Sequence, residues 1–160
     1  MNLIDRQAMY PLFFESLDYI LKKFPFYKRT AEYILNSFDI DYYLFAEKIC
    51  KLLLSKAGNK ENYLHALDSF IKVSVDYLKL QTQLRKSGHY LYQNFSEVNS
   101  AVYQNEFMES NYLDSLLVSQ VFWPNHFKLI RYFKTFCDTL DESSEGMEVP
   151  CGAGRRGRGY

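Results

Sequence analysis

The residues with the clearest chemical pattern in this sequence are 146–154, where Gly-Met-Glu-Val-Pro-Cys-Gly-Ala-Gly has the character of a short strand running into a glycine turn. An acidic residue, a β-branched residue and a Gly-x-Gly step form the turn that a strand–helix unit places against a nucleotide-like ligand. The glycines remove the Cβ atoms that would block this approach, and the amide groups of the following helix face the ligand. The pattern therefore predicts a ligand-binding turn.

This stretch resembles motif I of the class I S-adenosylmethionine-dependent methyltransferases, whose pattern is (D/E)-x-G-x-G-x-G. Glu148 takes the acidic position, and Gly152 and Gly154 take the second and third glycine positions. Pro150 stands where the family has its first glycine, and proline fixes φ near about −65° and has no amide hydrogen. The Trp-Pro-Asn-His run at 123–126 is similar to a step found before motif I in many small-molecule methyltransferases.

The resemblance implies S-adenosylmethionine as the cofactor and a small molecule as the methyl acceptor. Cys151 takes a variable position of the motif where the family has a small residue, so its thiol is expected to fill space. No catalytic residue is assigned, because a nucleophilic cysteine needs a nearby base and the sequence offers none. The implied cofactor-binding residues are Glu148, Cys151, Gly152, Ala153 and Gly154, and the implied cleft-lining residues are Trp123 and His126.

The last residues of the chain depart from the family. The family holds the cofactor's ribose with an acidic residue about twenty residues after motif I, by the logic of dinucleotide sites, and that position lies beyond residue 160. Residues 155–160 contain three arginines, two glycines and no aliphatic residue, so they cannot form a core-facing helix. Five of the seven glycines lie at or after Gly146, whereas residues with AT-rich codons dominate upstream. We therefore expect a truncated, N-terminal piece of a methyltransferase that is inactive alone.

Composition and charge narrow the class of protein. An apolar share of 48% supports a buried core, and 19 basic residues balance 19 acidic ones. A net charge of zero gives no general attraction to nucleic acid or to an anionic membrane. No uncharged apolar run reaches the roughly 18 residues of a membrane span, and residues 1–6 lack the basic start of a secretion signal. We expect a cytoplasmic protein without nucleic-acid or membrane partners; its oligomeric state is left open.

Cysteine and histidine spacing gives no metal site. Cys50, Cys137 and Cys151 lie far apart without CxxC spacing and are expected to be reduced thiols. His65 and His89 are isolated from other residues at ligand spacing, so we expect no bound metal.

Hydrophobic periodicity predicts a mostly α protein with about six helices. The resemblance to the methyltransferases implies that these helices form a cap that leads into the first strand and glycine loop of an incomplete Rossmann-like α/β domain. Residues 1–140 form the helical, substrate-side domain in this interpretation, and residues 141–160 form the linker, strand and loop. Pro11 divides the first helical stretch, Gly58 takes a left-handed cap position, and Pro124 begins the last helix. Within 89–109 we expect a loop and one short helix capped by Ser96. The expected helical ranges are 3–23, 26–38, 42–55, 61–86, 111–121 and 125–140.

Two other functions remain open. The aromatic helices could form a protein–protein interaction module without catalysis, in which exposed apolar surface marks the binding face. The arginines of 155–160 could contact nucleic acid on a flexible chain, although three arginines and a neutral balance give this little support. A pocket wall for a flat acceptor could come from Tyr42, Tyr43, Tyr90 and Tyr92.

Overall fold

The computed structural model describes residues 3–92, 94–100 and 106–141, and these residues are mostly helical. Eight α-helices and one 3-10 helix account for nearly all of them, and no strand occurs within the described ranges. The predicted strand and glycine loop at 146–154 lie outside the described residues. The elements are α1 (Leu3–Met9), α2 (Pro11–Lys23), η1 (Pro25–Tyr27), α3 (Lys28–Ser37), α4 (Ile40–Ala57), α5 (Lys60–Ser87), α6 (Phe95–Val98), α7 (Glu106–Phe122) and α8 (Pro124–Cys137).

Several predicted helix boundaries are confirmed. Pro11 begins α2 and separates it from α1, and Pro124 is the first residue of α8. Gly58 follows α4 with φ of 77°, and Gly88 follows α5 with φ of 71°. These φ values lie in the left-handed region, where glycine carries no Cβ penalty, so both glycines end their helices at low conformational cost.

Other boundaries differ from the expectation. Asn94, rather than Ser96, caps α6, because its side chain accepts a hydrogen bond from the Glu97 amide. The expected helix over 26–38 is a 3-10 turn followed by α3, since Pro25 supplies the first helical φ. Asp39 takes the N-cap position of α4, but its carboxylate pairs with Arg131 at 3.2 Å. The helix expected at 111–121 corresponds to α7, which begins earlier, at Glu106.

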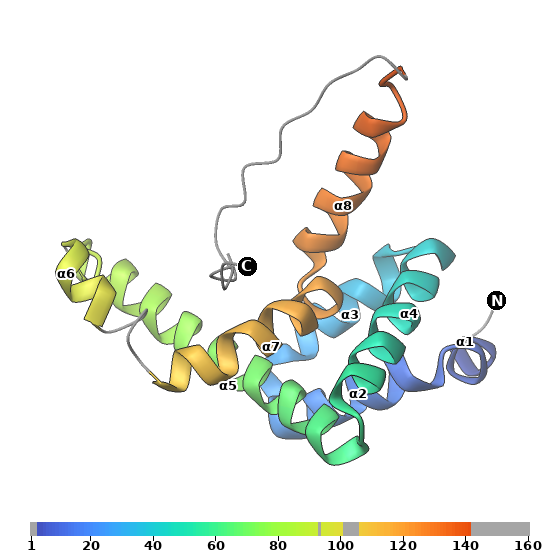
Figure 1. The fold of residues 1–160 in the computed structure, drawn as a ribbon, viewed down its shortest axis with the longest axis horizontal. Helices are drawn as coiled ribbons and strands as arrows, with labels where there is room; N and C mark the ends of the chain where they lie inside the picture. Colours follow the sequence, from blue (N-terminus) through green and yellow to red (C-terminus); the bar gives the residue numbers. More distant parts are fainter. Residues whose placement is uncertain (1–2, 93, 101–105, 142–160) are drawn as a thin grey trace, which may run out of the picture.

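The core lies among α2, α4, α5 and α7, which pack on one another, and α5 and α7 lie side by side (Figure 1). Aromatic rings fill much of it: Phe13 contacts Tyr42 edge to face at 5.8 Å and stacks on Phe122 at 5.9 Å. Such contacts bury large apolar areas in preferred ring geometries. Tyr42 and Tyr43 are therefore core residues, and the prediction that they form a pocket wall is wrong.

A buried carboxylate ties α4 to the start of α2. The first amides of a helix have no partner within that helix. Glu47 Oε2 accepts a hydrogen bond of 2.8 Å from the Phe13 amide, in the first turn of α2, and Oε1 lies 3.2 Å from Lys51 Nζ. The negative charge also complements the positive end of the helix dipole.

Two buried tyrosines tie η1 and α4 to the end of α7. Because Pro124 interrupts the helix, the last carbonyls of α7 lack helical donors. Tyr42 Oη donates to the Val121 carbonyl at 2.8 Å, and Tyr27 Oη donates to the Phe122 carbonyl. Burial raises the pKa of both phenols, so they remain hydrogen-bond donors. These bonds fix the corner between α7 and α8.

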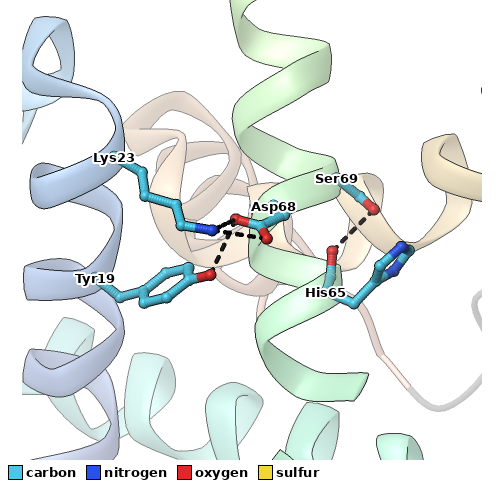
Figure 2. A network of polar contacts seen from close by, with 5 residues as sticks. All are labelled: Tyr19, Lys23, His65, Asp68 and Ser69. Atoms are coloured by element: carbon cyan, nitrogen blue, oxygen red, sulfur yellow. Dashed lines mark hydrogen bonds and ion pairs between the residues drawn. The ribbon is translucent and has the colours of Figure 1, made fainter. Parts of the chain in front are cut away.

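A polar cluster at the surface joins α2 to α5. Figure 2 shows Tyr19 and Lys23 of α2 converging on Asp68 of α5, with Lys23 Nζ 2.8 Å and Tyr19 Oη 3.1 Å from Asp68 Oδ1. The hydrogen bond to Asp68 raises the pKa of Lys23. The ring of His65 points away from this cluster (Figure 2).

The last helix, α8, projects from the corner away from the bundle (Figure 1). Phe127 is 3% exposed and packs on the core, whereas Phe133 is 64% exposed. The helically spaced apolar residues Phe127, Ile130, Phe133 and Phe136 thus contact the core only at Phe127. The outward side chains of α8 and the residues just after it include Leu129, Tyr132, Phe133, Phe136 and Leu140. Across the described residues, no helix combines the length and apolarity needed to cross a bilayer.

Candidate functional site

The α7–α8 corner borders an open groove of about 870 Å³, here called the corner groove. One wall comes from η1 and α3, the second from the middle of α5, and the third from the corner itself. Its volume lies within the range of small-molecule sites, roughly 300–1,000 Å³. The lining residues that bear on its chemistry are Arg29, Tyr33, Ser74, Tyr77, Trp123, His126 and Lys128.

Trp123 is held in place by its backbone and by neighbouring rings. Its φ of −107° and ψ of 105° are extended, as expected for a residue before proline, and its amide donates to the Ser119 carbonyl at 2.9 Å. The indole lies 6.1 Å from the Phe70 ring and 6.0 Å from the Tyr77 ring. Trp123 and Tyr77 therefore give the groove a wall of aromatic rings.

His126 lies in the first turn of α8, edge to face with Trp123 at 5.2 Å. Its Nδ1 is 3.1 Å from Ser119 Oγ, and that hydroxyl donates its own hydrogen to the Leu116 carbonyl at 2.7 Å. Gln120 Nε2, an amide donor, lies 3.4 Å from the same Nδ1, so Nδ1 can donate to Ser119 Oγ in one tautomer or accept from Gln120 in the other. Desolvation lowers the pKa of His126, so the ring is neutral at pH 7. A neutral ring can accept a proton from a ligand at its unprotonated nitrogen.

The charge of the corner groove is positive. Arg29 and Lys128 line it, and no Asp or Glu among the described residues does. Lys128 Nζ lies 5.0 Å from the centre of the Tyr33 ring, a cation–π distance. Arg29 forms no ion pair with any described residue, so its guanidinium is available to an anion.

Ser74, on α5, contributes a buried hydroxyl without a partner. The residue is 7% exposed and lines the corner groove, and its Oγ has no hydrogen-bond partner in the described part of the chain. Serine within a helix ordinarily donates to the carbonyl four residues earlier. An unsatisfied buried hydroxyl costs free energy, which a ligand that hydrogen-bonds to it would recover.

The structure brings together only part of the site expected from sequence. Trp123 and His126 both line the corner groove, whereas the expected cofactor-binding residues lie outside the described residues. Tyr90 and Tyr92, expected in a pocket wall, do not line this groove. The expected cofactor-binding residues are Glu148, Cys151, Gly152, Ala153 and Gly154.

Sequence reasoning missed the residues opposite the corner. Tyr77 and Ser74 share a face of α5, three residues apart, and Arg29 and Tyr33 share a face of α3, four residues apart. These spacings were visible in the sequence, but which face of each helix meets the corner depends on tertiary packing.

Metal and thiol chemistry find no support in this part of the chain. No group of three or more His, Cys, Asp or Glu side chains that could hold a metal ion occurs among the residues that the structure describes. Cys50 is buried in the core and Cys137 is exposed on α8, and both thiols are free.

Comparisons with protein-family models, with curated proteins and with solved structures find no match for this chain.

Proposed function

We propose that this chain supplies the acceptor-binding helical region, and the start of the cofactor-binding domain, of an S-adenosylmethionine-dependent methyltransferase. The observation that carries the proposal is the position of Trp123 and His126 on an aromatic groove at the start of α8, the helix that precedes 146–154. In this proposal the groove holds a small-molecule methyl acceptor.

The groove suits the acceptor rather than the cofactor. S-adenosylmethionine carries a positive sulfonium, an ammonium group and one carboxylate, so its net charge is positive, and the charged residues on the groove are Arg29 and Lys128. Like charges brought together in a partly desolvated site repel. Residues 148–154 are therefore the proposed cofactor-binding segment, and S-adenosylmethionine would supply the methyl group there.

The described residues would position and activate the acceptor. Methyl transfer requires the attacking atom in line with the methyl carbon, at roughly 3–3.5 Å. The rings of Tyr77 and Trp123 would hold a flat acceptor in one orientation. The neutral ring of His126 would accept the proton that the acceptor loses, as a general base with a pKa below the operating pH.

The first test is to read the coding DNA through and beyond codon 160 in all three frames. The proposal requires that one frame continues from the glycine turn into an apolar helix and a second strand ending in Asp or Glu. The protein encoded by that frame should transfer radiolabelled methyl groups from S-adenosylmethionine, and Gly152→Val should abolish the transfer. Stops in every frame directly after Tyr160 would overturn the proposal.

Residues 1–160 alone should bind S-adenosylmethionine weakly or not at all, and should show no turnover. The reason is that the acidic residue expected about twenty residues after motif I, which binds the ribose, is not among them. Isothermal titration of the purified chain measures this, and micromolar affinity would contradict it.

A protein–protein interaction module is the second candidate, and the outward face of α8 favours it. Leu129, Phe133 and Phe136 are more than half exposed and share one side of the helix. The same face of a second copy would cover these side chains with matching chemistry. Light scattering across a concentration series tests this: a reversible dimer that Phe133→Ser abolishes supports the module, and a monomer at all concentrations excludes this mode.

A further inference from the structure

We infer that the corner groove binds a planar aromatic carboxylate. The identification of this ligand as the methyl acceptor rests on the proposed function, whereas the binding itself rests on the groove alone. The argument uses three features of the groove: its charge, its aromatic wall and the hydroxyl of Ser74.

The charge of the groove selects an anion. Arg29 and Lys128 line it and no Asp or Glu among the described residues does, so the lining itself offers two cations to a ligand and no anion. A planar guanidinium binds a carboxylate through two parallel hydrogen bonds, which fixes the orientation of the bound group as well as its charge. A cationic ligand would meet repulsion at both residues.

The aromatic wall selects a flat ring. Tyr77 and Trp123 lie 6.0 Å apart with an interplanar angle of 42°, and Tyr77 is 54% exposed at the groove. Exposed rings of this kind stack on planar ligands or contact them edge to face, with a gain beyond simple burial. Tyr33, held under Lys128, continues the aromatic surface towards the positive rim.

Ser74 supplies a specific polar contact at the base of the wall. Its Oγ is buried and has no hydrogen-bond partner among the residues that the structure describes, and Tyr77 lies three residues further along the same helix face. A hydroxyl both donates and accepts a hydrogen bond, so it can pair with a carboxylate oxygen or with a hydroxyl on the ligand's ring. The ligand would thereby supply a partner that the described residues do not provide.

The test is titration of the 160-residue chain with 2-naphthoate, followed by nuclear magnetic resonance and calorimetry. The chain has one tryptophan, so the Trp123 indole gives a single N–H signal at the groove. We expect 2-naphthoate to shift this signal saturably. Neutral 2-naphthalenemethanol, which keeps the rings, should bind about tenfold more weakly, since it lacks the charge-assisted bonds.

Variants separate the groove from general charge attraction. Arg29→Gln with Lys128→Gln should weaken 2-naphthoate binding about tenfold or more. The matched control, Lys48→Gln with Arg85→Gln, removes the same charges from exposed positions outside the groove and should leave the affinity unchanged. Ser74→Ala should weaken binding several-fold while the chain stays folded, because alanine suits a helix interior.

An unshifted indole signal at millimolar 2-naphthoate would overturn the inference. Equal affinity for the neutral alcohol, or equal losses in the groove and control variants, would do the same. None of these experiments uses S-adenosylmethionine. A failure here therefore removes the ligand class and leaves the methyltransferase proposal to the DNA test, and a failed DNA test leaves the binding result intact.

Discussion

Cys50 and Cys137 differ in the reactivity that their surroundings allow. Burial raises the pKa of Cys50 to about 12, because the apolar core disfavours the thiolate, whereas Cys137 is exposed on α8. The thiolate is the reactive species. In a Cys151→Ser background, we expect Ellman's reagent to label one thiol in the native protein and the second only after denaturant is added. Two thiols reacting at equal rates in the native protein would contradict this.

His126 makes stability depend on pH in a defined direction. Its pKa is lowered in the folded chain, so the unfolded chain, with an ordinary histidine pKa near about 6.5, binds the proton more readily. The stabilising effect of the neutral ring is complete above that unfolded pKa. It is lost as pH falls through the lower, folded pKa.

Urea unfolding at pH 7.5 and pH 5.0 measures this effect. His126→Asn should lose less stability than the parent chain between the two pH values, since His65 and His89 remain in both proteins. An equal loss in the variant and the parent would show that His126 contributes nothing to the pH dependence.

At the scale of single elements, Glu47 is the residue on which the start of α2 depends. Removing a charged acceptor from a buried amide costs about 2 kcal/mol, so we expect Glu47→Ala to lower the free energy of unfolding by that amount. Glu47→Gln keeps an oxygen acceptor and should cost roughly half as much.

Chemical denaturation monitored by circular dichroism gives these differences in unfolding free energy. Glu32→Ala is the control. Glu32 is exposed, and its Oε1 lies 4.0 Å from Lys28 Nζ. An exposed ion pair of this kind stabilises the fold by under about 1 kcal/mol. If Glu47→Ala costs no more than this control, the carboxylate does not stabilise α2.

The elements show which features a sequence can predict. Pro11, Gly58 and Pro124 set helix boundaries through their own backbone chemistry, so these boundaries were predictable from local residues. Asp39 takes the N-cap position of α4, but its carboxylate pairs with a residue ninety-two positions away. The hydroxyl of Tyr42 would suit a surface position, yet the residue is buried, and its Oη donates to the Val121 carbonyl in the last turn of α7. Such choices depend on packing between distant segments.

Part of the candidate site was likewise predictable from local residues, and the rest depends on packing between distant segments. The Trp-Pro step and His126 stood out because their residue types are distinctive within a few positions. Arg29, which supplies part of the groove's charge, and the hydroxyl of Ser74 come from α3 and α5, which the sequence places far from α8. These residues line the groove because α3, α5 and α8 pack around it, and no local sequence pattern predicts that packing.

For the whole molecule, the core is unevenly distributed along the long helices. The buried residues of α5 end at Ser74, and Tyr77, Leu78 and Leu80 are exposed. Few buried contacts allow a segment to open without global unfolding. Hydrogen exchange followed by mass spectrometry should therefore show faster exchange for 75–87 and for 128–137 than for 40–57. Uniform protection across these three segments would contradict a core confined to one end of α5.

The position of the chain's one tryptophan also has an optical consequence. Trp123 lies beside Tyr77 and Phe70, at the junction of α7, α8 and the corner groove, in a chain with fourteen tyrosines. Excited tyrosines pass energy to a nearby indole, so emission from the folded chain is gathered at this one ring. The emission intensity and the wavelength of the emission maximum therefore report whether the α7–α8 junction is intact and how much water reaches Trp123.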